Sequence, residues 1–176
     1  MRIARLLATD ALRYRALMLE AYDIASDAFT STAAERAGAP MAWWADRIDP
    51  ADGLAEAFVA LDGESLVGTV ALSYSAKPKT RHAALVIGLY VCPAHRRSGA
   101  AAALMRAAMA SASARPETQV LQLTVTEGNE PAIRLYQSLG FLAWGTEPMA
   151  IRTRAGFKGK VHMWLRLPRG TAVVPP

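Results

Sequence analysis

The sequence predicts a single α/β domain with a mixed, mostly antiparallel sheet, in the order β-α-α-β-β-β-α-β-α-β-β. Three observations lead to this prediction. Asp62 and Gly63 separate two apolar runs, which is a strong signal for an antiparallel hairpin. The apolar run at 82–91 and the alternating run at 119–127 flank an alanine-rich helix, and such a unit joins two parallel strands. Two more strand patterns close the chain as a further hairpin.

Length and composition agree with one domain. The chain has 176 residues, of which 52% are hydrophobic and 20% are charged, which is typical of a soluble globular protein. We expect the domain to span residues 1–168. The tail at 169–176 ends in two prolines and is expected to be flexible.

The first part of the chain predicts one strand and two helices. Residues 2–8 fit a short strand, and Thr9 is expected to cap a helix over 10–22. The buried face expected for this helix consists of Leu12, Ala16, Leu19 and Tyr22. Residues 23–40 are small and polar, so they predict a loop with at most a helical turn. A second short helix is expected to begin at Pro40, because proline is tolerated in a first turn.

The middle of the chain predicts three strands and a long helix. Strands are expected at 56–61 and 65–75, on the two sides of the hairpin turn. The run at 82–91 is apolar on both faces, which predicts a central position in the sheet. The following helix ends before Pro116. Its apolar positions recur at helical spacing: Ala101, Leu104, Met105, Ala108, Met109 and Ala112.

The last part of the chain predicts a strand, a helix and a closing hairpin. The run at 119–127 alternates between apolar and polar residues, as a half-buried strand does. Asn129 is a good N-cap for the next helix, and Gly140 is a good residue to follow its end. Strands at 141–149 and 160–167 complete the domain.

Charge and composition argue against several classes of protein. The net charge of +5 is mild, and the basic residues are scattered except at 77–82, without the pattern of a nucleic-acid-binding module. One cysteine and three distant histidines make a metal site unlikely on sequence grounds, so we expect no metal. The charged N-terminus lacks the apolar stretch of a signal peptide, and no apolar run is long enough for a membrane span. We therefore expect a cytoplasmic protein with no nucleic-acid or membrane partner.

A cluster of polar residues lies where the strand at 82–91 turns into the alanine-rich helix. Arg96, Arg97, Ser98 and Gly99 supply two positive charges, a hydroxyl and a backbone without Cβ. A helix N-terminus adds free N–H groups and partial positive charge, so the junction suits a pyrophosphate. The narrow first turn consists of Ala100, Ala101 and Ala102. The alternative is a surface turn with two solvated arginines, since neither G-x-G-x-x-G nor the P-loop signature occurs.

Two motifs resemble one protein family. Arg96-x-x-Gly99-x-Ala101 matches the Q/R-x-x-G-x-G/A pattern of the GNAT superfamily, the acyl-CoA-dependent N-acetyltransferases. The longer string "LYVCPAHRRSGAAAALM" is similar to that family's "LYVxPxxRxxGxGxALL". Further on, "VTEGNEPAIRLYQSLGF" resembles the family's "VxxxNxxAxxLYxxxGF", and the matching residues are Val125, Asn129, Ala132, Leu135, Tyr136, Gly140 and Phe141. Each motif falls at a predicted strand–helix junction.

The resemblance implies how acetyl-CoA would bind. In this family the two parallel strands splay apart, and the pantetheine arm of the cofactor enters the gap and pairs like an extra strand. The pairing residues here would be Leu89, Tyr90 and Val91, with a backbone N–H facing the thioester carbonyl. The pyrophosphate would lie on the junction from Arg97 to Ala102.

The resemblance also implies roles for two residues of the second motif. Asn129 would contact the pantetheine arm in addition to capping its helix. Tyr136 would be the general acid that protonates the departing CoA thiolate, for which a phenol with a pKa of about 10 is suitable. Judged from the residues alone, packing of a half-buried aromatic ring under the sheet is the better explanation of Tyr136.

This sequence departs from the family pattern at the group that takes up the proton of the attacking amine. There is no carboxylate between His82 and Val91, and Thr124 stands where some relatives have glutamate. A water chain, His82, Glu20 or Glu127 could serve, and the sequence favours none of them. Cys92 has no motif-paired histidine, so we expect a small residue at a strand end and not a nucleophile. Four aromatic residues could line an acceptor pocket or pack in the core: Tyr22, Phe29, Trp43 and Trp44.

The expected function is therefore transfer of an acetyl group from acetyl-CoA to a primary amine, of a small molecule or a peptide N-terminus, by direct attack. The oligomeric state is expected to be monomeric or homodimeric. A non-catalytic acyl-CoA-binding module on the same fold is the alternative; the missing strand carboxylate favours it and Tyr136 opposes it. A nucleic-acid-binding domain would rest only on the net charge and the basic loop at 77–82.

Overall fold

The computed structural model describes residues 1–168, so the predicted flexible tail lies outside the described residues. The predicted order of strands and helices is confirmed, with a short helix α2 and three 3₁₀ turns added. The strands are β1 (Arg2–Arg5), β2 (Ala55–Asp62), β3 (Ser65–Tyr74), β4 (Ala83–Val91), β5 (Val120–Thr126), β6 (Leu142–Thr153) and β7 (Gly156–Arg166). The helices are α1 (Ala11–Ile24), α2 (Ala33–Ala37), α3 (Met41–Asp46), α4 (Ala100–Ala114) and α5 (Glu130–Ser138), and the 3₁₀ turns are η1 (Ala8–Asp10), η2 (Ser26–Ala28) and η3 (Pro93–His95).

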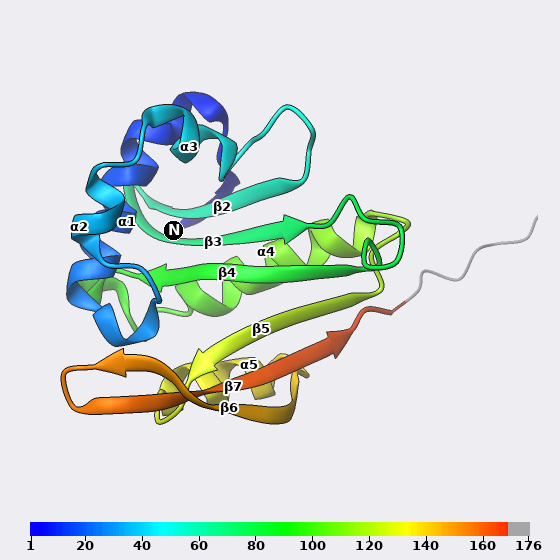
Figure 1. Ribbon diagram of the computed structural model, residues 1–176. Helices are drawn as coiled ribbons and strands as arrows, with labels where there is room; N and C mark the ends of the chain where they lie inside the picture. The colour runs from blue at the N-terminus through cyan, green and yellow to red at the C-terminus, as the bar shows by residue number, and fades with distance from the viewer. Residues whose placement is uncertain (169–176) are drawn as a thin grey trace, which may run out of the picture.

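The strands form one seven-stranded sheet in the order β1-β2-β3-β4-β5-β7-β6 (Figure 1). Within this sheet β4 and β5 run parallel, and the other neighbours are antiparallel. The predicted hairpin is confirmed, because Asp62 pairs with Ser65 around the turn. The predicted central strand is β4, which lies between β3 and β5. The sequence prediction of a mixed, mostly antiparallel sheet is therefore correct.

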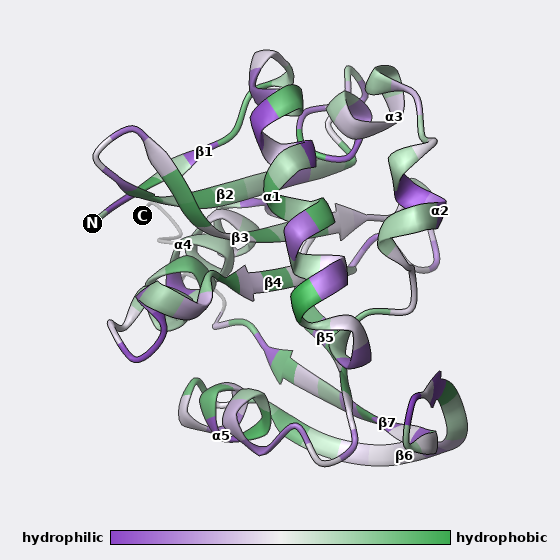
Figure 2. Ribbon diagram, turned by 90° about the vertical axis from the view of Figure 1, so that its left-hand side faces the viewer, coloured by the Kyte–Doolittle hydropathy of each residue, from purple (hydrophilic) through white to green (hydrophobic). Residues whose placement is uncertain are grey.

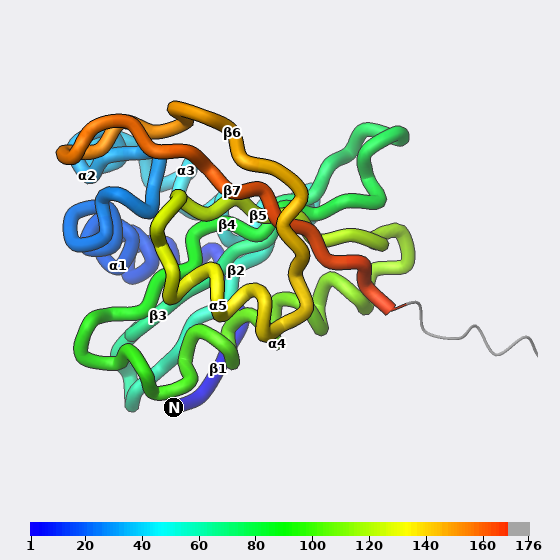
Figure 3. The backbone as a smooth tube through the Cα atoms, turned by 90° about the horizontal axis from the view of Figure 1, so that it is seen from below, coloured from blue at the N-terminus to red at the C-terminus, as the bar shows by residue number. Residues whose placement is uncertain are grey.

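Helices cover both faces of the sheet, and each face has its own hydrophobic core. Helices α4 and α5 lie on one face, and α1 and α3 lie on the other (Figure 3). The predicted face of α4 is confirmed, with Leu104, Met105, Ala108 and Ala112 fully buried. Alanine on this face lets the helix lie close to the strands, since little side-chain volume separates them.

The predicted buried face of α1 is right at Tyr22, which is buried, and at Leu19, which is partly buried against the core, but wrong at the other two positions. Leu12 is 66% exposed, and Ala16 is exposed as well. The residues that α1 buries are Ala11, Tyr14, Leu17, Met18, Ala21 and Tyr22. Apolar residues occur all around this helix, so periodicity alone does not identify the face that meets the sheet. Thr9 is also not the N-cap, because it lies inside η1 and α1 begins after Asp10.

Helix α2 lies in the segment that we expected to be a loop with at most a helical turn. Thr32 Oγ1 accepts a hydrogen bond from the Glu35 backbone N–H at 3.2 Å, and Glu35 Oε2 accepts one from the Thr32 N–H at 2.8 Å. This reciprocal capping box satisfies two N–H groups that a helix start would otherwise leave unpaired. The sequence signal for it, Thr followed by Glu at the third position, was present and overlooked.

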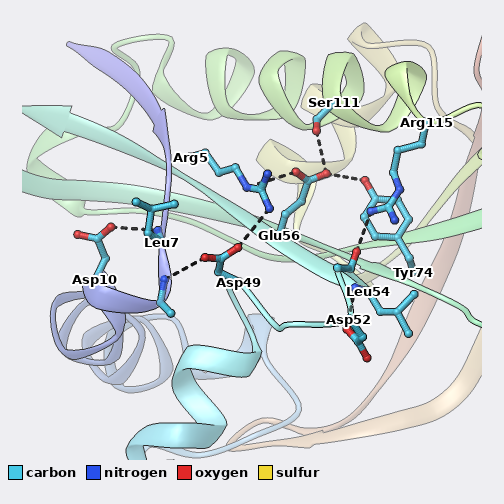
Figure 4. A network of polar contacts seen from close by, with 12 residues as sticks. Arg5, Leu7, Asp10, Asp49, Asp52, Leu54, Glu56, Tyr74, Ser111 and Arg115 are labelled. Atoms are coloured by element: carbon cyan, nitrogen blue, oxygen red, sulfur yellow. Dashed lines mark hydrogen bonds and ion pairs between the residues drawn. The ribbon is translucent and has the colours of Figure 1, made fainter.

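A buried carboxylate ties the C-terminal end of α4 to the sheet (Figure 4). Glu56 in β2 is only 4% exposed. Its Oε1 accepts hydrogen bonds from Tyr74 Oη at 2.6 Å and from Ser111 Oγ at 2.8 Å. Arg5 from β1 approaches the other carboxylate oxygen at 3.7 Å. The guanidinium of Arg115, one helical turn after Ser111, lies 3.7 Å from the centre of the Tyr74 ring. One buried charge therefore joins β1, β2, β3 and α4.

Substituting Glu56 tests how much this network stabilises the fold. Glu56→Ala should lower the free energy of unfolding by about 3–5 kcal/mol, because the Tyr74 and Ser111 hydroxyls lose their acceptor in a buried site. Glu56→Gln keeps an acceptor oxygen and should cost clearly less. Urea denaturation of both variants measures the difference. Equal stability of the two variants would show that the network contributes little.

Candidate active site

The strands β4 and β5 pair only at one end and then diverge. Ala83 to Leu85 pair with Val120 to Gln122, and the strands part beyond these residues (Figure 1). Figure 2 looks at the side where they part, with β4 above the gap and β5, β7 and β6 below it. The predicted splay is thus present, and it leaves the edge of β4 toward its carboxyl end without a strand partner on that side.

A bulge in β4 lies within this free edge. Thr69 of β3 pairs with Tyr90 and Ala71 pairs with Ile87, so the single residue between them in β3 faces two in β4. The first of these two is Gly88, whose φ is 67°, a conformation that glycine adopts at little cost. Because a bulge bends its strand, this one directs the end of β4 away from β5.

A cleft of about 1050 Å³ occupies the space between the diverging strands. Most of the residues that we predicted to bind a cofactor line it: Leu89, Tyr90, Val91, Arg96, Arg97, Gly99, Ala100, Ala101, Ala102 and Asn129. Ser98 and Tyr136 are not among its lining residues. Further lining comes from residues 23–29, Arg154 and Lys158, which lie outside both motifs, and from Thr126 and Glu127, which are unmatched positions of the second motif.

One end of the cleft is built on the N-terminus of α4. Arg97 has a φ of 62° and Gly99 has a φ of 85°, so the loop turns sharply before the helix starts. A Cβ on Gly99 would meet no atom of the described chain within 4 Å, so the backbone there is open to a ligand. Arg96 donates from Nε to the carbonyl of Val91 at 3.2 Å, which holds its guanidinium at the strand end. Open N–H groups and two guanidiniums make this end suitable for an anion.

The hydroxyl of Ser98 is used within this loop. It donates to the carbonyl of His95 at 2.6 Å and accepts a long hydrogen bond, 3.4 Å, from the Ala100 N–H. The predicted role of this hydroxyl was a contact with the ligand. In the structure its hydrogen bonds shape the turn that presents Gly99.

The wall opposite the α4 N-terminus begins at Asn129. Its side-chain oxygen accepts from the Ala132 N–H at 3.4 Å, which confirms the predicted N-cap of α5. Gly140 follows the helix end with a φ of 92°, also as predicted. Tyr136 lies two turns beyond Asn129, is 7% exposed, and packs against Phe141 with ring centres 6.0 Å apart. Burial raises the pKa of the Tyr136 hydroxyl to about 12, so it keeps its proton at neutral pH.

The sequence of this chain matches a family with this architecture. The model of the "Acetyltransferase (GNAT) family" matches residues 18–141, which include both motifs and the whole splayed unit. The chain belongs to the GNAT acetyltransferase family. In this GNAT domain the cleft between β4 and β5 is therefore the site where the family's chemistry is expected.

Individual relatives of this GNAT domain are distant. "L-amino acid N-acetyltransferase AaaT" of Escherichia coli (strain K12) is 29% identical over 103 residues, and the match spans 58% of this chain and 62% of that relative. An acetyltransferase from Salmonella typhimurium, yncA, solved with its cofactor acetyl-CoA, has a TM-score of 0.77 at 20% identity and covers 100% of this chain and 98% of its own. A ribosomal-protein-alanine N-acetyltransferase from Brucella melitensis has a TM-score of 0.76 at 21% identity, covering 95% and 100%. At such identities the solved structures establish the fold.

The other end of the GNAT cleft is assembled by contacts between distant segments. Thr126 Oγ1, at the end of β5, donates to the carbonyl of Asp27 in η2 at 2.7 Å. Asp27 also lies 3.7 Å from the ammonium of Lys158 on β7. The Glu127 carboxylate accepts from the Gly159 N–H at 3.2 Å. These contacts bring the end of α1, the end of β5 and the β6–β7 hairpin to one place. Sequence motifs gave no signal for them, because each contact joins segments far apart in the chain.

The open candidates for the proton acceptor lie in different places. His82 precedes the first residue of β4, at the opposite end of the strand from the cleft, and is exposed there. Thr124 is exposed on β5 and opposite His162 of β7. Glu127 lines the cleft. Glu20 of α1 does not line the cleft, but Tyr90 does. The Tyr90 hydroxyl donates a hydrogen bond to the Glu20 carboxylate at 2.9 Å.

The four aromatic residues in doubt divide between core and cleft. Trp44 is fully buried, and Tyr22 is buried against the ring of Phe29 at 5.1 Å. Phe29 lines the cleft. Trp43 is half-buried, with the guanidiniums of Arg36 and Arg47 over its ring at 4.5 and 5.3 Å. Only Phe29 of the four thus borders the space that a substrate could enter.

Two kinds of feature are absent from residues 1–168, a group of metal ligands and a helix that could span a membrane. No group of three or more histidine, cysteine or carboxylate side chains that could hold a metal ion occurs in this part of the chain. None of the helices in the described range is both long and apolar enough to span a membrane.

Cys92 is predicted to be dispensable. Burial, together with the nearby Glu20 carboxylate, raises the pKa of the thiol to about 11, so it carries almost no thiolate at neutral pH. Iodoacetamide should alkylate Cys92 much more slowly than free cysteine at pH 8, as intact-mass spectrometry would measure. Cys92→Ala should leave turnover within about threefold, because direct attack needs no acyl-enzyme. An acetyl group trapped on Cys92 would contradict this prediction.

Proposed function

We propose that this chain is an N-acetyltransferase that moves the acetyl group of acetyl-CoA to a primary amine by direct attack. The observation that carries the proposal is the free edge of β4, which leads without interruption to the anion-binding N-terminus of α4. An extended pantetheine arm suits the first feature and a pyrophosphate suits the second. The family supports the same assignment.

The donor side follows from these two features. Backbone groups of Leu89, Tyr90 and Val91 would pair with the amides of the pantetheine arm, as a neighbouring strand does. The N–H groups from Gly99 to Ala102 and the guanidinium of Arg97 would hold the pyrophosphate. Asn129 lines the opposite wall, where its side chain can contact the arm while it caps α5.

The chemical step requires charge stabilisation at two atoms. As the amine nitrogen attacks, negative charge develops on the thioester oxygen, and a backbone N–H beside the β4 bulge can stabilise it. As the intermediate collapses, the carbon–sulfur bond breaks and the sulfur leaves as a thiolate that needs a proton. We propose Tyr136 as its donor, because the family resemblance assigns it this role and its hydroxyl stays protonated at neutral pH, although Tyr136 itself is not among the residues that line the cleft.

The acceptor is a primary amine, and the relatives suggest which amines to try first. One curated relative is named for L-amino acids and one similar structure for ribosomal-protein alanine. The panel should therefore contain free amino acids, short peptides with a free N-terminus, and simple amines. Release of CoA thiol measured against this panel tests the proposal. If no acceptor raises thiol release while acetyl-CoA still binds, the chain is instead a non-catalytic acyl-CoA-binding module.

Binding of acetyl-CoA should be visible without any acceptor. A ligand present at about 100 times its dissociation constant stabilises the folded state by about 2.7 kcal/mol, which raises the melting temperature. Arg97→Glu should largely abolish this rise, because it places a negative charge beside the pyrophosphate. Gly99→Val should do the same by filling the open space at the backbone.

The control for these variants is a charge reversal on the same helix. Arg106→Glu changes an exposed residue of α4 that does not line the cleft and should keep the full shift. The melting temperature of each variant without ligand shows whether it folds. A full wild-type shift in both Arg97→Glu and Gly99→Val would mean that the phosphate site lies elsewhere.

Tyr136→Phe should lower kcat and leave acetyl-CoA affinity unchanged. The ring and its packing against Phe141 remain, and only the hydroxyl is lost. The sulfur carries little charge until the thiolate leaves, so the loss appears in the transition state and not in binding. We expect about 10²-fold, the low end for general acid catalysis, because a thiolate is a fair leaving group. An unchanged kcat with an unchanged alkaline limb of the pH–rate profile would reduce Tyr136 to a packing role.

A further inference from the structure

Three of the carboxylates near the end of the cleft where the acceptor would bind, those of Asp27, Glu127 and Glu20, differ in the hydrogen bonds and ion pairs that they make. Asp27 is paired with Lys158, and its own carbonyl is bound by Thr126. Glu127 accepts from the Gly159 N–H, and a Cβ built on Gly159 would lie 3.0 Å from its Oε2, so this side chain lies against the backbone of β7. Both carboxylates thus hold the β5–β7 junction together. Neither is well placed to exchange these contacts for a substrate.

Glu20 lies one helical turn before the residues of α1 that line the same end of the cleft. Glu20, Asp23 and Ile24 are spaced i, i+3 and i+4 along α1, so they share one face of the helix. Asp23 and Ile24 line the cleft, and Glu20 lies one turn earlier on that face. Figure 1 shows the end of α1 beside the arrowhead of β4, where β4 and β5 have already parted.

A hydrogen bond fixes the Glu20 side chain to the reacting strand. Tyr90 Oη donates to Glu20 Oε1 at 2.9 Å, joining residues 70 apart in the sequence. Tyr90 is buried, while Glu20 itself is exposed. Burial and the Glu20 carboxylate both raise the pKa of Tyr90, so its hydroxyl remains a donor. A carboxylate has about four lone-pair positions, so one bound by Tyr90 can still accept from an ammonium group.

The charged groups around Glu20 leave its carboxylate able to bind a cation. It faces the neutral hydroxyl of Tyr90 on β4 and the neutral thiol of Cys92, the residue after this strand, and the charge of Arg96 in the next loop acts on both groups. Asp23 adds a second carboxylate on the same helix face. Asp27 in η2 is engaged by Lys158. No salt bridge joins Glu20 to a cation within residues 1–168, so its charge is available.

We propose that Glu20 binds the ammonium group of the acceptor and takes up its proton, held in place by Tyr90. This inference rests on the proposed acetyltransferase function. The acceptor enters as R–NH₃⁺ and passes one proton to the carboxylate, which later releases it to solvent. The freed lone pair attacks the thioester carbon. The nitrogen then gives up a second proton as the carbon–sulfur bond breaks, and the departing sulfur gains one, so that CoA leaves as a thiol.

The test compares Glu20→Gln with a control, Glu117→Gln, which makes the same chemical change at an exposed residue that does not line the cleft. The exposed ion pair of Glu117 with Arg81 contributes little to the stability of the fold. Both variants are assayed for CoA thiol release with whichever amine of the panel the wild-type protein acetylates best. At pH 7, Glu20→Gln should lose about 10²-fold in kcat/KM for the amine, within the usual range for proton-transfer catalysis, and Glu117→Gln should lose none. The acetyl-CoA melting shift should be unchanged in both.

The pH dependence separates a base from a structural carboxylate. In Glu20→Gln the amine must lose its proton to solvent, so its rate should rise about tenfold for each pH unit until the free amine dominates. The deficit should therefore shrink at alkaline pH, and Glu20→Asp should recover part of the rate at pH 7. Tyr90→Phe, which keeps the ring, should show a smaller loss of the same pH-dependent kind.

The outcomes are distinguishable from failure of the proposed function. If the wild-type protein acetylates an amine and Glu20→Gln behaves as Glu117→Gln does, the role of Glu20 is overturned and the enzyme function stands. A deficit that is equal at all pH values also overturns it, since that result indicates a structural role. If the wild-type protein acetylates no amine of the panel, the proposed function fails and the role of Glu20 fails with it.

Discussion

The parting of β4 from β5 is the constraint on which the rest of this structure depends. Two parallel strands that pair for only three residues leave backbone donors and acceptors facing a gap, and such groups require partners. The bulge at Gly88 bends β4 at the point where pairing has stopped. Gly68 of β3 supports the same geometry from the other side, because a Cβ there would lie 2.8 Å from the carbonyl of Tyr90. Glycines on two strands thus shape an edge that an extended ligand can complete.

The two ends of the cleft are built in physically different ways. The end at the N-terminus of α4 is local: a turn with two residues at positive φ leads into the first turn of the helix. The other end is assembled by contacts across the chain, such as Thr126 with Asp27 and Tyr90 with Glu20. A local site needs only a correct loop and helix. An assembled site changes whenever the packing of α1 or the β6–β7 hairpin changes.

The long helix α4 extends from the cleft to strands β2 and β3 of the sheet. Its N-terminus remains open to a ligand, whereas its C-terminal half is tied to β2 and β3 through Ser111, Arg115 and the buried Glu56. Its apolar face packs directly on the strands. A helix held along its length and at its far end presents fixed N–H groups at its start. Binding an anion there then costs little ordering of the protein.

The sequence by itself determined the order of elements, the hairpin at Asp62 and Gly63, the caps at Asn129 and Gly140, and the turn that leads from β4 into α4. These features depend on neighbouring residues, so propensity, periodicity and motif spacing are enough to predict them. The sequence could not determine which face of α1 is buried, because apolar residues occur all around that helix and only the sheet selects among them. It also left the proton acceptor open among distant residues. Only the tertiary structure brings Glu20 to Tyr90, because 70 residues separate them and no local pattern records a contact of that range.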